Sequence, residues 1–234
     1  MKNSISFRLW GRYALFTDPI TKVGGEKCTY HLPTYEAIKG VLKSIYWKPT
    51  LVWHVDRVRV IKPLRTQTKG TKPLNWSGGN TLAYYTFLHE VEYQVEAHFE
   101  WNEHRPELAR DRVDGKHFAI ANRMLEKGGR QDIFLGTRDC QGYVEPCVFG
   151  EGEGAYDNID ELGFGLMFHS FGYPDETGNN ELTSRFWHGV MKNGVIDYPH
   201  VSACPVTRYV RKMNAKSFEL EHNIQSAEQT ERCL

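Results

Sequence analysis

Three stretches of the chain alternate apolar and polar residues with the two-residue period of a β-strand, and residues 132–135 form a short apolar run. Residues 4–10 place their apolar side chains on one face. Residues 51–62 alternate with a change of phase after Val55, which predicts a bulge. The clearest alternation is in residues 91–101, whose apolar and aromatic side chains we expect in the core. The opposite face of this strand is rich in glutamate and would repel RNA, so we expect no open aromatic stacking platform on it.

Two stretches have helical spacing instead. The first begins beside Pro33, a residue typical of a first helical turn, and we expect it to end before Pro49. At about 100° per residue, Lys39, Lys43 and Tyr46 share a stripe next to the buried one. The apolar stripe of this helix consists of Ile38, Val41, Leu42 and Ile45.

The second helix is predicted to start at Asp114, a favourable N-cap residue, and to stop at Gly128 and Gly129. Lys116 and His117 then fall in its first turn. Free backbone N–H groups and the helix dipole favour an anion there. The segment is therefore a candidate place to hold a phosphate.

The order strand, helix, strand, strand, helix, strand predicts an α+β fold, with a ferredoxin-like (RRM-like) βαββαβ domain over residues 1–150. Residues 63–80 read as a long basic loop or hairpin. Beyond residue 150 the chain is richer in glycine and acidic residues, with strand-like patches at 163–171 and 204–211. We expect a smaller β-rich domain over residues 151–234, with a disordered stretch over the last dozen residues.

Composition narrows the functional classes. The chain has 234 residues and 40% hydrophobic content, without an apolar run long enough to span a bilayer or a secretory signal, so we expect a cytoplasmic protein with no membrane partner. Five cysteines form no Cys-x-x-Cys pair, and the histidines show no metal-ligand spacing. We therefore expect no metal site and no cofactor.

The net charge of zero hides a strong segregation of charge along the sequence. Between residues 39 and 72 there are nine basic residues and one acidic residue, whereas residues 139–184 contain ten acidic residues and no lysine or arginine. A local basic field can hold a polyanion whatever the total charge, although solvated basic strands and loops would give the same pattern. The candidate RNA-binding residues are Lys39, Lys43, Arg57, Arg59, Lys62, Arg65, Lys69 and Lys72.

Several longer motifs carry a family resemblance. Residues 9–19 (LWGRYALFTDP) and 30–42 (YHLPTYEAIKGVL) resemble a CRISPR-associated family of the RAMP superfamily, and within it the subtype I-C members that process precursor CRISPR RNA. Residues 115–118 (GKHF) and 134–138 (FLGTR) extend the match, which covers nearly the whole chain.

The resemblance implies a ferredoxin-like domain with a β-rich tail, and a metal-independent endoribonuclease that cuts each repeat next to its hairpin. It also implies that the protein stays on the 5′ handle of the mature crRNA, as a subunit of a type I-C interference complex. The catalytic group of the family falls on Tyr46, Lys116 and His117. Some relatives have lost cleavage and only bind the RNA handle, so a non-catalytic subunit is the alternative, and a metal-dependent DNA nuclease is a further one.

Metal-free RNA cleavage needs a base for the 2′-OH, an acid for the leaving 5′ oxygen and positive charge for the phosphorane, and it leaves a 2′,3′-cyclic phosphate. Tyr46 could act as the base, with Lys39 and Lys43 lowering its pKa, and His117 as the acid. The reverse assignment of Tyr46 and His117 is equally open. Lys116 would stabilise the developing charge.

Overall fold

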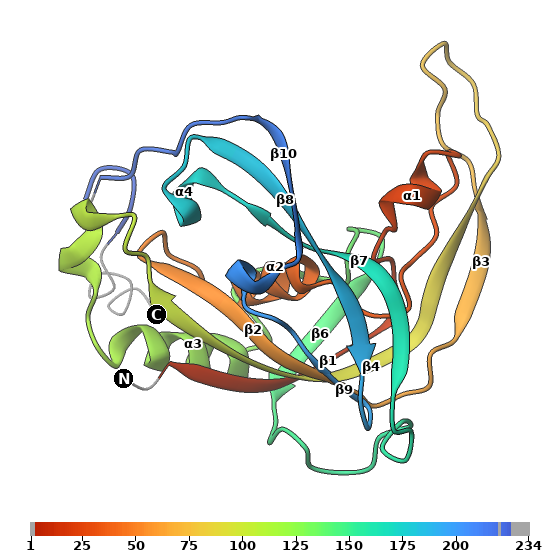
Figure 1. Cartoon of the computed structure of the whole chain (residues 1–234), viewed down its shortest axis with the longest axis horizontal. Coiled ribbons are helices and arrows are strands. Elements are labelled where there is room, and N and C mark those ends of the chain that lie inside the picture. The colour runs from red at the N-terminus through yellow and green to blue at the C-terminus, as the bar shows by residue number, and fades with distance from the viewer. Residues whose placement is uncertain (1–2, 220, 226–234) are drawn as a thin grey trace.

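A computed structural model describes residues 3–219 and 221–225, which form two antiparallel sheets with helices packed against them (Figure 1). The larger sheet has seven strands in the order β5-β6-β1-β4-β2-β9, and β3 pairs with β4 outside this path. Its strands are β1 (Ser4–Ala14), β2 (Leu51–Val60), β3 (Thr66–Thr71), β4 (Ala83–Trp101), β5 (Ile133–Phe134), β6 (Gln141–Pro146) and β9 (Val195–Asp197). The smaller sheet has the order β10-β8-β7, with β7 (Leu162–Gly172), β8 (Glu181–Met191) and β10 (Val206–Lys212).

The helices are short, and two of them have eleven residues. They are α1 (Pro19–Lys22), α2 (Tyr35–Ile45), α3 (Lys116–Glu126) and α4 (Pro174–Thr177), with 3-10 turns η1 (Pro106–Asp111) and η2 (Val201–Ala203). None of the described helices is both long and apolar enough to cross a membrane.

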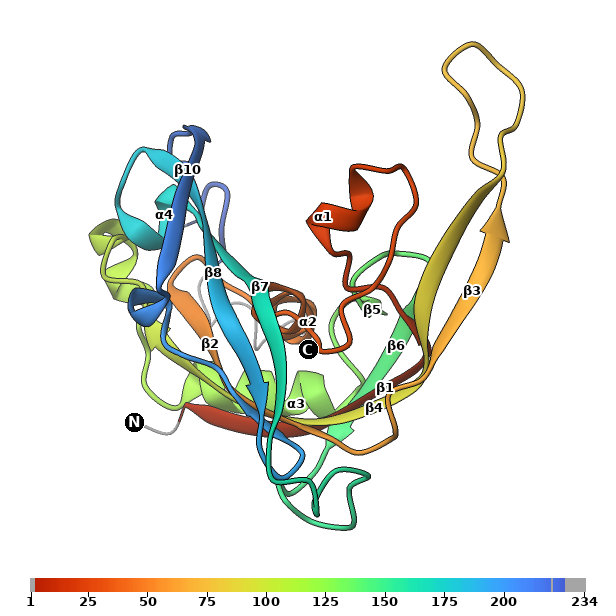
Figure 2. The same ribbon diagram turned by 45° about the vertical axis from the view of Figure 1, so that its right-hand side comes forward.

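The strand β4 is the centre of the larger sheet. Its 19 residues pair with β1, β2 and β3, and its inward side chains from Val91 to Phe99 are buried as the alternation predicts. The expected bulge in β2 is confirmed, because the register against β4 shifts between Val55 and Arg57. The basic segment after β2 forms β3 and the loop of a hairpin arm that projects from the sheet (Figure 2), with Trp76 fully exposed in its loop.

The glutamate-rich face of β4 is not an open acidic surface. Glu92 accepts a hydrogen bond from Arg8 and lies near Lys62, and Glu96 accepts one from Arg57. The neighbouring strands thus supply cations for Glu92 and Glu96, whereas Glu90 and Glu100 are exposed and lie near histidines. The expected absence of an aromatic stacking platform on this face stays a prediction.

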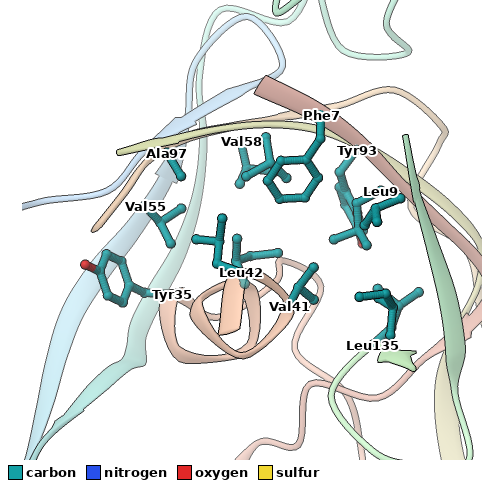
Figure 3. Close-up of a cluster of buried hydrophobic side chains, with 14 of the residues drawn as sticks. Phe7, Leu9, Tyr35, Val41, Leu42, Val55, Val58, Tyr93, Ala97 and Leu135 are labelled. Atoms are coloured by element: carbon teal, nitrogen blue, oxygen red, sulfur yellow. The ribbon is translucent and has the colours of Figure 1, made fainter. Parts of the chain in front are cut away.

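Helix α2 has the predicted buried stripe, which packs against the larger sheet (Figure 3). Its cap is Thr34, whose hydroxyl accepts a hydrogen bond from Ala37 N at 3.2 Å. The helix ends at Ile45, well before Pro49, because Tyr46 adopts an extended backbone conformation. This turn removes Tyr46 from the stripe that it was expected to share with Lys39 and Lys43.

Helix α3 does not begin as the sequence predicted. Its N-cap is Gly115, with φ +77°, and no side-chain hydrogen bond caps it, so the assignment of Asp114 as the cap was wrong. The glycine can take this backbone conformation without the steric penalty of a side chain. Gly128 and Gly129 both have positive φ and close the other end as expected.

The two halves of the chain, residues 1–150 and the residues after 150, share one hydrophobic core. Met167, Trp187 and Ile196 belong to the same buried cluster as β1 and α2, and β9 pairs with β2 in the larger sheet. Strands β8 and β9 had no counterpart in the sequence prediction, and β6 rather than the short β5 lies beside β1. The predicted disorder of the last dozen residues falls mostly on residues 226–234, outside the described part.

A buried ion pair joins the halves. Lys39 of α2, with an exposed fraction of 2%, binds the carboxylate of Glu176 in α4, and Lys43 binds the same carboxylate at 3.1 Å. Further links are the hydrogen bond from Tyr198 to Pro33 O and the one from Phe171 N to Glu36.

We expect Lys39→Met to lower the free energy of unfolding by about 3 kcal/mol, because it leaves a buried carboxylate with only one of its two cations. Lys192→Met is the matched control, since its pair with Glu161 is exposed and should contribute less than about 1 kcal/mol. Urea unfolding of both variants measures the difference. Equal losses would contradict a structural role for the Lys39–Glu176 pair.

Candidate active site

The turn after α2 and the first turn of α3 bring together two side chains that are 71 residues apart in the sequence. The hydroxyl of Tyr46 lies 2.9 Å from Nδ1 of His117, and Nε2 of His117 lies 2.6 Å from the backbone oxygen of Asp111. A carbonyl oxygen can only accept a hydrogen bond, so Nε2 carries the proton. The neutral imidazole then has its lone pair on Nδ1, where it accepts the hydrogen bond from Tyr46.

Two further polar side chains hold this arrangement, and neither was singled out from the sequence. The carboxylate of Asp111, 1% exposed, accepts a hydrogen bond from Thr50 at 2.7 Å and lies 3.8 Å from His117 Nε2. Trp53 donates to the backbone oxygen of Tyr46 at 2.7 Å. The β2 strand and η1 thus fix the orientation of the imidazole and of the turn that carries the phenol. No sequence motif marks Asp111 or Thr50, because their role arises only from packing.

The pair is buried. Tyr46 and His117 are both 0% exposed, and the imidazole packs edge-on against Trp101 and near Phe99. Burial lowers the pKa of His117, because the charged imidazolium is poorly solvated there. An RNA phosphate can therefore reach the pair only if some of the covering residues move.

The C-terminal segment, residues 213–219 and 221–225, packs next to the turn that carries Tyr46. Lys48, which is 6% exposed and follows Tyr46 closely in the chain, donates to the backbone oxygen of Gln225 at 2.6 Å. Phe218 packs on Trp47 with ring centroids 6.1 Å apart.

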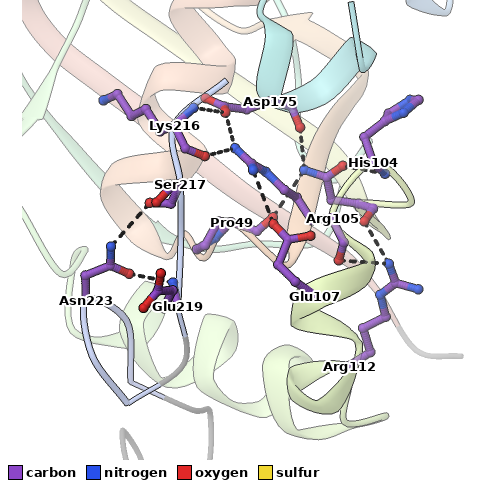
Figure 4. Close-up of polar contacts among 11 residues, drawn as sticks. Pro49, His104, Arg105, Glu107, Arg112, Asp175, Lys216, Ser217, Glu219 and Asn223 are labelled. Atoms are coloured by element: carbon purple, nitrogen blue, oxygen red, sulfur yellow. Dashed lines mark hydrogen bonds and ion pairs between the residues drawn. The ribbon is translucent and has the colours of Figure 1, made fainter. Parts of the chain in front are cut away.

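Arg105 ties the same segment to the rest of the protein (Figure 4). Its guanidinium binds Asp175 and the backbone oxygen of Lys216, and Lys216 N donates to Asp175 at 2.8 Å. The C-terminal segment is therefore anchored to both α4 and the loop before η1.

Lys116 precedes His117 in the first turn of α3 and is half-buried. Its role as the cation of the site stays a prediction. Lys48 adds a second cation nearby, and its positive charge also lowers the pKa of His117, although less than burial does.

The predicted RNA-binding cations fall into two groups. Lys39 and Arg59 are buried and ion-paired, the latter to Asp157 at 2.6 Å. Arg57 and Lys62 are exposed but lie against glutamates of β4. Arg65 and Lys72 flank β3 and are exposed, and the ammonium of Lys69 lies 3.1 Å from the ring centroid of Tyr13.

The charge segregation in the sequence is largely cancelled in space. Acidic residues of the 139–184 segment pair with basic residues from the first half of the chain: Glu145 with Arg8, Asp157 with Arg59, Asp175 with Arg105, and Glu176 with Lys39 and Lys43. The expectation that the whole basic segment forms an uncompensated face was therefore wrong for Lys39, Lys43 and Arg59.

Comparison with known proteins identifies the family of this chain. The model of a family described as CRISPR-associated protein (Cas_Cas5), of the Cas5d type, matches residues 4–199. The chain belongs to the Cas5d family. This confirms the resemblance carried by residues 9–19 and 30–42, and it places the Tyr46–His117 pair within the part of the chain that the family model matches.

Two relatives are named CRISPR pre-crRNA endoribonuclease Cas5d. The one from Mannheimia succiniciproducens is 29% identical over 89% of this chain and 100% of its own length, and the one from Thermus thermophilus is 28% identical over 83% and 91%. A crystal structure of a CRISPR-associated protein is similar to this fold, with a TM-score of 0.75 and 36% identity, covering 88% of this chain and 96% of the other.

Buried histidines make the stability of the protein depend on pH. The pKa of His54 and of His169 is lowered by burial to about 4, and that of His117 is lowered as well. The unfolded imidazoles take up protons near pH 6.5 while the buried ones resist, so the free energy of unfolding should fall as the pH drops from 6.5 towards 4. His98 acts in the opposite direction, because its hydrogen bond with Asp56 raises its pKa.

We expect His54→Gln to reduce the decrease in the free energy of unfolding between pH 6.5 and 4. One buried imidazole should account for a decrease on the order of 3 kcal/mol. Urea unfolding at several pH values between 6.5 and 4 measures the free energy of unfolding of each variant. His98→Gln is the control, and its stability should fall more steeply with decreasing pH than that of the wild type, because the raised pKa of His98 stabilises the protein at low pH. Parallel curves for wild type and His54→Gln would contradict the prediction.

Proposed function

We propose that this protein is an endoribonuclease that cleaves precursor CRISPR RNA within the repeat, next to its hairpin, without a metal ion. It then stays bound to the 5′ handle of the crRNA as a subunit of a type I-C interference complex. The observation that carries the proposal is the hydrogen bond between Tyr46 and the neutral His117, beside Lys116. The endoribonuclease names of the two Cas5d relatives support it.

The proposed architecture is a ferredoxin-like domain over residues 1–150 with a β-rich part over 151–234. The neighbour order β6-β1-β4-β2, with α2 between β1 and β2 and α3 between β4 and β6, supports the split βαβ assignment. In such an arrangement both helices follow inner strands of the pattern, and their adjoining turns carry Tyr46 and His117.

The protonation states of Tyr46 and His117 favour a proton relay from the ribose 2′-OH through the phenol to the imidazole. Tyr46 already donates its proton towards Nδ1 of His117, so the phenol oxygen can take the proton of the ribose 2′-OH as its own proton passes to the imidazole. The 2′-oxygen then attacks the phosphorus as the bond to the 5′ oxygen breaks. The imidazolium of His117 gives the proton that it received to the leaving 5′ oxygen, so the products are a 2′,3′-cyclic phosphate and a 5′-hydroxyl. Lys116 stabilises the charge of the phosphorane.

Phosphate contacts outside the pair are assigned to cations that face solvent. Arg65 and Lys72, which flank the arm strand β3, are the best placed of the predicted residues. Arg57 and Lys62 are exposed but ion-paired with glutamates of β4, and Lys69 is half-buried over the ring of Tyr13. Lys39, Lys43 and Arg59 serve mainly to join the two halves through Glu176 and Asp157.

A second function is a subunit that binds the crRNA handle without turnover. The complete burial of Tyr46 and His117 favours it, because an enzyme with this pair must first open.

The cleavage chemistry gives the deciding test. We expect the purified protein to cut RNA of its own CRISPR repeat in the presence of EDTA, because acid, base and cation are all side chains. Mass spectrometry of the fragments should find a 2′,3′-cyclic phosphate and a 5′-hydroxyl. Cutting that stops in EDTA, or fragments with a 5′-phosphate, would contradict the mechanism. An uncut, tightly bound RNA would identify the handle-binding subunit.

We expect Tyr46→Phe, His117→Ala and Lys116→Ala each to slow single-turnover cleavage by about a hundredfold or more. RNA binding should change little for the first two, since neither side chain carries charge. The controls are Tyr143→Phe, an exposed phenol on β6, and Lys127→Ala at the far end of α3, which should cleave as wild type. The double variant Tyr46→Phe/His117→Ala should be much less impaired than the product of the single effects. Wild-type rates in both single variants would exclude this site.

A further inference from the structure

One face of α2 is open. Gly40 lies in the middle of this helix and is exposed, and a Cβ built on it would meet no atom of the described residues within 4 Å. Glycine is the poorest helix former after proline, so helix stability does not account for its presence here. An exposed glycine in a helix leaves room for another molecule to approach the backbone closely.

Gly40 lies on the floor of a groove of about 740 Å³, a size typical of ligand pockets. Its lining residues come from α2, the smaller sheet, α1 and β5, among others. Figure 2 shows how these elements lie around α2. Its wall on the smaller sheet is aromatic: Phe168 lies 4.9 Å from Phe171 and 5.9 Å from Phe186, measured between ring centroids, and all three are half-buried.

Cations stand at the rim of this aromatic groove. Lys22 of α1 and Arg138 after β5 line it, and both are exposed. Such a combination of aromatic faces and flanking cations suits a single-stranded nucleic acid, because bases stack on the rings while phosphates meet the charges. A purely apolar peptide would gain nothing from Lys22 and Arg138.

The groove also continues to the C-terminal end of α2. Its residue Ser44 is shared with a second cavity of about 370 Å³, which is lined by Lys43, Trp47 and Arg130. Trp47 is 37% exposed and directly follows Tyr46. An RNA strand lying along the open face of α2 would thus reach Trp47, the neighbour of Tyr46 in the sequence.

We infer that the groove over Gly40 binds unpaired nucleotides of the RNA, with bases against Phe168, Phe171 and Phe186 and phosphates at Lys22 and Arg138. The inference rests on the proposed function, which identifies the RNA as the CRISPR repeat. It adds the place on the protein where the single-stranded part of this RNA binds. Glu36, the acidic residue that lines the groove, is half-buried, and its carboxylate accepts a hydrogen bond from Phe171 N at 3.1 Å, which partly satisfies it within the protein.

The test uses the full chain and a short fluorescent single-stranded RNA of mixed sequence, with fluorescence anisotropy as the readout. Gly40→Leu fills the floor of the groove with a good helix former, so the protein should fold normally and bind the RNA at least about tenfold more weakly. Gly163→Leu is the matched control, because Gly163 is exposed on β7 outside the groove, with open space and an ordinary backbone. It should bind as wild type.

Two further measurements identify the contact. Phe171→Leu and Phe186→Leu keep apolar volume but lose the ring, and each should weaken binding by about fivefold or more. An oligonucleotide of the same length without bases should bind wild type more weakly than the RNA does, and Gly40→Leu should abolish that preference. Thermal unfolding of each variant checks that the fold is retained.

The outcomes separate this inference from the proposed function. Wild-type RNA affinity in folded Gly40→Leu would overturn the groove as an RNA site, even if the repeat RNA is still cut in EDTA. That result would leave the groove as a surface for a protein segment. Loss of binding in Gly40→Leu, alongside a wild type that does not cut RNA, would support the groove and refute only the catalytic proposal.

Discussion

The strand β4 is the constraint on which the rest of the structure depends. The alternation of its residues 91–101 turns one face to the core, and its 19-residue length lets it pair with β1, β2 and the arm strand β3 at once. A slip of one residue would exchange its buried and exposed faces, so the register of the central sheet is strongly fixed. The helices α2 and α3 pack against this sheet, and their turns meet where Tyr46 reaches His117.

Electrostatic pairing completes the assembly of the two halves. The acidic residues of the second half meet basic residues of the first, in the pairs Lys39–Glu176, Arg59–Asp157 and Arg105–Asp175. Buried ion pairs of this kind add specificity to an interface more than they add net stability, because both charges lose hydration. A chain of zero net charge therefore uses part of its segregated charge internally. The cations left to solvent include Arg65 and Lys72 at the arm and Lys22 and Arg138 at the groove over α2.

The candidate active site combines two opposing requirements. Burial keeps His117 neutral and orients it through Asp111 and Thr50, which suits proton transfer from Tyr46. The same burial closes the pair to RNA. The contacts of Lys48 and Trp47 with the C-terminal segment place residues beyond 199, where the family match ends, next to the turn that carries Tyr46.

The sequence by itself determined the strands β1 and β2, the alternating part of β4, the buried stripe of α2, the bulge in β2 and the family, because each depends on local periodicity or on long contiguous motifs. It also named Tyr46 and His117, through the resemblance. It did not show that Tyr46 leaves the α2 stripe, that Gly115 caps α3, or that Lys39 and Arg59 are buried against acidic residues more than 90 positions away. Those outcomes depend on which distant groups pack together, and tertiary structure decides them because a buried charge or donor takes whatever partner the fold brings within reach.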